Sequence, residues 1–207
     1  MTGKSEGRRR GSGRPPAGAA SVRDALLRSA ATHFSKHGYA GASTRAILSE
    51  AGATAPALYH HFGNKTGLYI AAAAAAQEHV LSAFTAAIAD HATLADRMSA
   101  LLAEAVALRQ EHPNVAKYLS VIQQDTARHA ELSELDSYEA QFNVLWQSVA
   151  PGPQPETATA VALRAVVEGL LAVGGAHIEM RDIAAAAEVL RRITRTGLAG
   201  DYRRPPV

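Results

Sequence analysis

Cysteine is absent from this 207-residue sequence, and aromatic residues make up only 5% of it. Without cysteine the chain has no disulfide, no thiolate nucleophile and no thiolate metal ligand. Long alternating runs of β-branched residues are also missing, whereas alanine, which favours helix, supplies much of the 47% hydrophobic content. The composition therefore predicts an all-helical protein with enough apolar residues for a sizeable core.

Long hydrophobic runs are lacking as well. The longest candidate, residues 68–76, ends at Gln77-Glu78-His79 and is too short to span a membrane. The basic N-terminus is not followed by the apolar stretch that a signal peptide requires. We therefore expect a cytoplasmic protein.

The most informative stretch is residues 43–65, which predicts two short helices around a tight turn. A Ser-Thr pair at its start can cap the first helix, and Gly52 suits the left-handed residue that ends that helix. Thr54 offers a second N-cap, and Pro56 falls in the first turn of the second helix, where a missing N–H costs nothing. Two helices joined by a glycine turn are the layout of a DNA-binding helix-turn-helix.

The same stretch resembles the signature of the TetR family of bacterial transcriptional regulators. The residues that match in order and spacing are Thr44, Ile47, Ala51, Gly52, Thr54, Leu58, Tyr59, His61, Phe62 and Lys65, preceded by Ala30, Phe34 and Gly38. The match covers roughly residues 21–70, and beyond it the resemblance is one of helical pattern and length. Two positions depart from the family pattern: Leu48 replaces a small alanine, and Pro56 replaces a glycine.

The resemblance implies a helix-turn-helix domain of three helices over residues 21–66, with its motif at 43–62. A helical domain of six helices that binds an effector and dimerises is expected over residues 67–199, followed by a tail at 200–207. Helical periodicity predicts a long fourth helix that links the two domains. Outside the motif, the expected helices are Val22–His37, Asn64–Ala89, Leu94–Glu111, Asn114–His129, Glu131–Val149, Thr157–Ile178 and Asp182–Leu198.

The motif and its flanks supply the residues expected to meet DNA. The predicted DNA-binding residues are Thr44, Arg45, Thr54, Ala55, Pro56, Tyr59, His60, His61 and Lys65. Compact side chains at the start of the second helix allow close approach to the bases, and the resemblance implies a phosphate clamp at its end. The alternative for Tyr59, His60 and His61 is that they form a polar helix end that packs on the first helix. Few of these groups make bidentate base contacts, so we expect DNA shape to supplement direct readout.

The segment 1–20 is rich in Gly, Ser, Pro and Arg and holds five basic residues and one acidic residue, although the net charge of the chain is only +2. Such a segment cannot bury enough apolar surface to offset the entropy of ordering, which predicts a disordered basic arm. The arm either contacts DNA beside the motif or only aids solubility.

Members of the family commonly bind a small ligand among helices four to eight, and the ligand lowers their DNA affinity. The residues expected to line such a site are His79, Phe84, Met98, Leu102, Tyr118, Ile122, Phe142, Trp146 and His177, with Arg109 and Gln123 as further polar candidates. For any one of them an ordinary core or surface position is the alternative. Charged residues are scarce on these helical stripes, so we expect an apolar or aromatic ligand.

The final two helices, 157–178 and 182–198, combine broad apolar coverage with small residues such as Gly174 and Gly175. Broad coverage predicts burial on two sides, and the resemblance implies a homodimer through a four-helix interface. The alternative is that both helices complete a monomeric core.

These observations favour a DNA-binding transcriptional regulator, in particular a dimeric repressor that a small ligand releases from a palindromic operator. The alternative is a helical small-molecule-binding or catalytic protein without specific DNA binding. Catalysis is disfavoured because we find no nucleophile elbow and no nucleotide-binding loop, and we expect no cofactor. His33 and His37 are four residues apart but have no third metal ligand at suitable spacing. Activation in place of repression stays open, because the position of the operator decides it.

Overall fold

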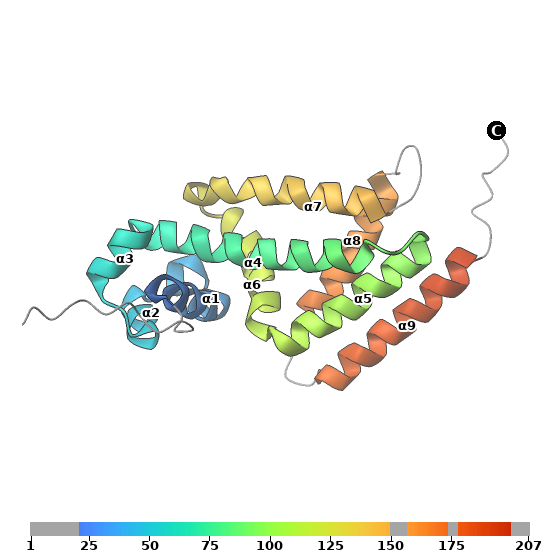
Figure 1. Ribbon diagram of the computed structural model, residues 1–207, viewed down its shortest axis with the longest axis horizontal. Helices are drawn as coiled ribbons and strands as arrows, with labels where there is room; N and C mark the ends of the chain where they lie inside the picture. Colours follow the sequence, from blue (N-terminus) through green and yellow to red (C-terminus); the bar gives the residue numbers. More distant parts are fainter. Residues whose placement is uncertain (1–20, 150–156, 174–177, 200–207) are drawn as a thin grey trace, which may run out of the picture.

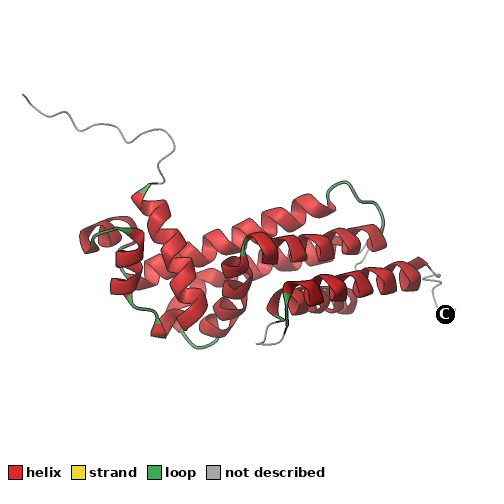
Figure 2. Ribbon diagram, turned by 90° about the horizontal axis from the view of Figure 1, so that it is seen from below, coloured by secondary structure: helices red, strands yellow, loops and turns green. Residues whose placement is uncertain are grey.

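The computed structural model describes residues 21–149, 157–173 and 178–199, and all regular secondary structure in these ranges is helical (Figures 1 and 2). The elements are α1 Val22–Gly41, α2 Thr44–Ala51, α3 Ala55–Phe62, α4 Lys65–Ile88, α5 Leu94–Glu111, α6 Pro113–Thr126, the 3₁₀ helix η1 Ala130–Leu135, α7 Asp136–Val149, α8 Thr157–Ala172 and α9 Met180–Ala199. The predicted all-helical fold class is confirmed. The predicted arm at 1–20 and tail at 200–207 lie outside the described residues.

Several predicted helices have different boundaries in the structure. The helix expected over Val22–His37 continues through a kink at Gly38 to Gly41, and the helix expected over Asn114–His129 ends at Thr126. The helix expected over Glu131–Val149 is divided into η1 and α7, because Leu132 and Leu135 are both buried and a 3₁₀ helix places residues three apart on the same side. The helix expected over Thr157–Ile178 ends at Ala172 within the described part of the chain.

Two hydrophobic clusters lie along α4, and this helix contributes to both of them. Its residues from Leu68 to Ala76 pack with α1, α2, α3, α6 and η1, and its residues from Val80 to Ile88 pack with α5, α6, α7, α8 and α9. Figure 1 shows α4 extending from α3 at one end to the α5–α9 bundle at the other. A shift of α4 in the second cluster is therefore carried to the first cluster by one continuous helix.

A buried carboxylate joins α6 to α1 and α4. Asp125 of α6 is only 7% exposed, and its Oδ2 accepts hydrogen bonds from the backbone N–H of Tyr39 at 2.7 Å and from the hydroxyl of Tyr69 at 2.8 Å. Gly38, at the kink of α1, has a φ of 67°, and a Cβ there would lie 3.3 Å from Asp125 Oδ1. Burial and the hydrogen bond to the carboxylate raise the pKa of Tyr69, so its hydroxyl stays protonated and donates.

The last two helices keep apolar side chains on the surface. On α9, which packs mainly on α5, Ile183 and Ala187 are buried whereas Val189 and Ile193 are exposed. Further exposed valines lie on or just after α8 at positions 161, 166 and 173. Among the described helices none has the length and hydrophobicity needed to cross a bilayer.

Candidate DNA-binding surface and ligand cavity

The predicted helix-turn-helix is present, and its local chemistry largely agrees with the sequence. Ser43 caps α2 by accepting the backbone N–H of Ala46, and Gly52 ends α2 in the left-handed conformation with φ 60° and ψ 30°. Thr54 holds the N-cap position of α3, but its hydroxyl makes no capping hydrogen bond within the described chain. This hydroxyl therefore remains available to a partner outside the fold.

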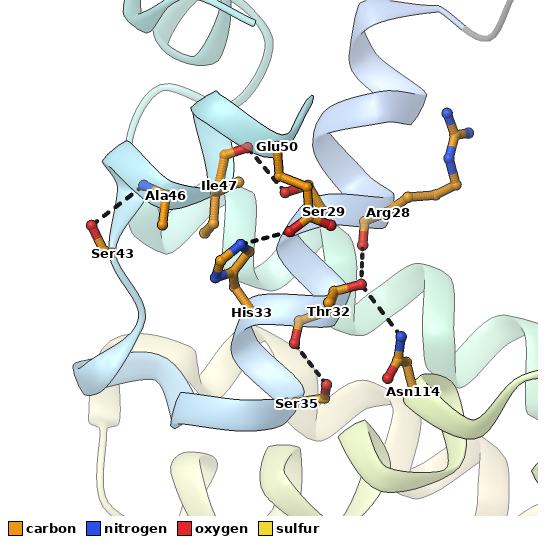
Figure 3. Close-up of polar contacts among 10 residues, drawn as sticks. All are labelled: Arg28, Ser29, Thr32, His33, Ser35, Ser43, Ala46, Ile47, Glu50 and Asn114. Atoms are coloured by element: carbon orange, nitrogen blue, oxygen red, sulfur yellow. Dashed lines mark hydrogen bonds and ion pairs between the residues drawn. The ribbon is translucent and has the colours of Figure 1, made fainter. Parts of the chain in front are cut away.

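The first helix fixes the orientation of the motif. The buried hydroxyl of Ser29 donates to the carbonyl of Ile47 at 3.0 Å, and Nε2 of His33 lies 2.9 Å from Oε2 of Glu50 (Figure 3). Leu58 of α3 is also buried, at 3% exposure. Apolar packing and these two polar contacts hold α2 and α3 against α1. One face of α3, the face that carries Leu58, is therefore buried.

The opposite face of α3 is open to solvent. Seven of the nine predicted DNA-binding residues are exposed, namely Arg45, Thr54, Ala55, Pro56, Tyr59, His60 and His61. Tyr59 is 64% exposed, which is unusual for a large aromatic residue in a chain with few aromatics. The alternative interpretation, in which the polar end of α3 packs on α1, does not fit this exposure.

The other two predicted DNA-binding residues, Thr44 and Lys65, are half-buried. Nζ of Lys65 donates to the carbonyl of Ala40 at 3.1 Å and lies 5.3 Å from the ring centre of Tyr39. Burial lowers the pKa of Lys65, and the charge of Asp125 partly opposes this change. Lys65 thus fastens the start of α4 to the end of α1, and its contact with phosphate stays a prediction.

Close contact between α3 and α4 depends on a residue that the sequence analysis did not identify. A Cβ at Gly67 would lie 2.0 Å from the carbonyl oxygen of Phe62, the last residue of α3. The N–H of Gly67 also donates to the side chain of Asn64, which caps α4. Only a residue without a side chain fits here, although this glycine has no positive φ to mark it.

We expect Gly67→Ala to displace α3 and to lower the free energy of unfolding by about 2 kcal/mol or more, as overpacking against backbone does. Urea unfolding followed by circular dichroism measures the loss. The matched control is Gly169→Ala on α8, where a Cβ would meet nothing within 4 Å. Alanine is favoured within helices, so this control should be neutral or stabilising. Equal stability of the two variants would contradict the proposed close contact.

A second candidate site is a cavity of about 310 Å³ between α4, α6, α7 and α8. It is lined by Gln77, Val80, Phe84, Ala116, Leu119, Ser120, Gln123, Glu139, Phe142, Trp146, Arg164, Ala165, Glu168, Gly169, Leu171 and Ala172. One part of this wall is apolar and aromatic, and another part carries amide and charged groups. The cavity adjoins α4 where this helix passes from one hydrophobic cluster to the other.

The structure gathers only part of the predicted ligand-binding set. Phe84, Phe142, Trp146 and Gln123 line the cavity, and Ile122 lines a neighbouring hollow. Three predicted residues, Met98, Leu102 and Tyr118, are instead buried in the hydrophobic clusters. His79 is exposed and packs against the ring of His112. Arg109 donates hydrogen bonds to backbone carbonyls of α8 and does not line the cavity either. His177 lies outside the described residues.

The charged part of the wall was not predicted. Arg164 donates to Oε1 and Oε2 of Glu139, to Oε1 of Glu168 and to Oδ1 of Asn143. Hydrogen bonding to Glu139 raises the pKa of Arg164, so it stays charged. Burial raises the pKa of Glu168, and Arg164 offsets part of this effect. An Arg-Glu pair four residues apart in a largely apolar helix was the available sequence signal.

Comparison with known proteins supports the interpretation of the motif. Residues 26–72, which span α1 to α3 and the start of α4, match the family model described as bacterial regulatory proteins, tetR family. Over this N-terminal region the chain is similar to the TetR family. Its members are transcriptional regulators, and the region matched is the one that holds the exposed face of α3.

One similar curated protein is the HTH-type transcriptional repressor AcnR of Corynebacterium glutamicum, with 39% identity over 51 residues. This match covers 25% of the chain and 27% of AcnR, so it concerns about a quarter of each protein.

Two solved structures share the fold over nearly the whole chain. A TetR-like regulator from Rhodococcus sp. RHA1 matches with a TM-score of 0.68 at 22% identity, covering 91% of this chain and 100% of that one.

The second solved structure is the regulator FadR of Bacillus subtilis in complex with stearoyl-CoA. It matches with a TM-score of 0.67 at 12% identity and covers 84% of this chain and 97% of its own. At these identities the two likenesses establish the fold alone.

Proposed function

We propose that this protein is a dimeric repressor of the TetR family that binds palindromic operator DNA through α3 and is released when a small molecule enters the cavity. The observation that carries the DNA-binding part is the exposed face of α3, which presents Thr54, Tyr59 and His60 opposite the buried Leu58. A helix held rigidly on one face and open on the other is suited to the major groove. Arg45 at the start of α2 adds a cation for phosphate or for a guanine edge.

The DNA-binding part is tested by fluorescence anisotropy with the intergenic DNA next to the protein's own gene. We expect this duplex to be bound much more tightly than a shuffled duplex of the same composition, with an affinity that falls steeply as salt rises. Equal affinity for the two duplexes would contradict a specific operator. Footprinting of the bound duplex should protect two half-sites related by two-fold symmetry.

Two copies are needed because a two-fold axis places two α3 helices in successive major grooves, about 34 Å apart. The exposed apolar residues of α8 and α9 support this part of the proposal. Val161, Val166, Val189 and Ile193 are between 38% and 61% exposed in a single chain, and a second copy would cover them.

For the dimer we expect Ile193→Glu to convert the protein largely to monomer, because a carboxylate at a buried apolar interface has no partner. Sedimentation velocity over a range of concentrations measures the mass. Val144→Glu is the matched control, since Val144 is a similarly exposed apolar side chain, at 67%, but belongs to α7 and not to the proposed interface helices. If both variants sediment as wild type does, α9 is not the interface.

The release of DNA by a ligand requires that the ligand prefer one arrangement of α4 over another. The cavity meets this need, because Gln77, Val80 and Phe84 of α4 form part of its wall. FadR, which shares the fold, holds stearoyl-CoA. The same helix contacts α3 at its other end, so a ligand that moves α4 would also move the DNA-binding surface.

A further inference from the structure

Two residues that line the cavity each have a buried polar atom without a hydrogen-bond partner within the described structure. These atoms are Nε1 of Trp146, whose residue is 2% exposed, and Oε1 of Gln77. A buried donor or acceptor without a partner costs about 1–3 kcal/mol, so native proteins rarely leave one unsatisfied. A ligand that reaches this donor and this acceptor from the cavity, and carries the complementary groups, would satisfy both of them.

The charged residues of the cavity exclude one class of ligand. Arg164 is the only cation among the lining residues described, and its hydrogen bonds go to Glu139, Glu168 and Asn143. It is therefore engaged with the protein's own carboxylates and is not presented to an anion. Two carboxylates against one guanidinium leave the wall with a net charge of about −1 in a partly desolvated place, which disfavours anions and favours cations.

We propose that the effector is a small organic cation, with a protonated amine at the Gln77–Glu168 end of the cavity and an apolar or aromatic body between Phe84, Phe142 and Trp146. The indole N–H of Trp146 would donate to an ether or carbonyl oxygen of the ligand. This inference rests on the proposed function, because it names the ligand class of the same regulatory cavity. It also revises the expectation of a largely apolar or aromatic ligand, which considered only the apolar stripes, by adding a positive charge to that ligand.

The state of Glu168 supports an ammonium partner. Burial raises the pKa of this carboxyl, which means that the folded protein stabilises its charge less than water does. An ammonium group beside it would restore that stabilisation and would lower the pKa again. Amine binding should therefore weaken as the pH falls and Glu168 takes up a proton, with Arg164 and Glu139 as the other charged groups in this wall.

The test uses three probes that share one body and differ in charge: methoxyphenyl-butylamine, methoxyphenyl-butanol and methoxyphenyl-butyrate. Calorimetry on the full-length protein gives the affinities, and Trp146 fluorescence reports the site directly because it is the only tryptophan in the chain. We expect the amine to bind about tenfold more tightly than the alcohol, and the acid to bind most weakly.

Glu168→Gln keeps the shape and the hydrogen bond to Arg164 but removes the charge. We expect it to reduce amine affinity about tenfold, to the level of the alcohol, and to leave alcohol affinity unchanged. Glu131→Gln on η1, an exposed position outside the cavity, is the matched control and should behave as wild type. The proposal is overturned if none of the probes binds, if the acid binds as tightly as the amine, or if the preference for the amine survives in Glu168→Gln.

Operator binding measured without any probe separates this inference from the function on which it rests. A protein that binds its operator but does not distinguish the three probes would refute only the ligand class. A protein that prefers the amine but binds no operator would refute the repressor function and leave the ligand class standing.

Discussion

Replacing Tyr59 by alanine should weaken operator binding by about tenfold or more, because one lost contact to DNA costs about 1–3 kcal/mol. The side chain is 64% exposed on α3, whereas the neighbouring Leu58 points into the fold. The free energy of unfolding should therefore change by no more than about 0.5 kcal/mol, as at other exposed positions. Fluorescence anisotropy at one fixed salt concentration measures the first quantity, and urea unfolding measures the second.

Val144→Ala is the matched control for this experiment, because Val144 is a similarly exposed side chain on α7, outside the motif. Its operator affinity should equal that of wild type. A Tyr59→Ala protein that keeps both its fold and its full operator affinity would show that this edge of α3 does not face DNA.

Replacing Asp125 by alanine should lower the free energy of unfolding by about 3 kcal/mol, since hydrogen bonds to a charged group are each worth about 1.5–3 kcal/mol. The change leaves the N–H of Tyr39 and the hydroxyl of Tyr69 buried without their acceptor. It also removes a link between α6 and α1. Urea denaturation followed by circular dichroism measures the effect.

Two milder variants test the cause of this loss. Asp125→Asn keeps one acceptor oxygen, and Tyr69→Phe removes one hydrogen bond of the two, so both should destabilise less than Asp125→Ala. The expected order of stability is wild type, Tyr69→Phe, Asp125→Asn and Asp125→Ala. An Asp125→Ala protein within about 0.5 kcal/mol of wild type would show that water replaces the carboxylate at no cost.

The DNA-binding motif could be predicted because its signals are local. Gly52 ends α2 in a conformation that only glycine adopts without strain, and a cap residue follows it within two positions. Leu58 and Phe62 marked the inward face of α3 by their spacing alone. Such signals need no knowledge of the rest of the fold, and the likeness to a known family drew on the same residues.

The cavity and the junctions between helices could not be predicted in this way. Arg164 and Glu168 are adjacent on one helix, but Glu139 reaches them from α7, which the sequence does not reveal. Asp125 is 86 residues away in sequence from Tyr39, whose backbone N–H donates a hydrogen bond to it. The need for Gly67 arises from the approach of two helix ends and not from its own backbone angles. These features depend on tertiary packing, and sequence patterns record only one helix at a time.

The length of α4 determines how far a small tilt of this helix would displace α3 at its end. A helix of 24 residues is about 36 Å long, so a tilt of about 5° around its centre moves each end by roughly 1.5 Å. In the proposed symmetric dimer the two displacements would add and would change the distance between the two α3 helices by about 3 Å, against a groove repeat of about 34 Å. A tilt of this size would therefore worsen the fit of the proposed dimer to two successive major grooves without any large rearrangement of the fold.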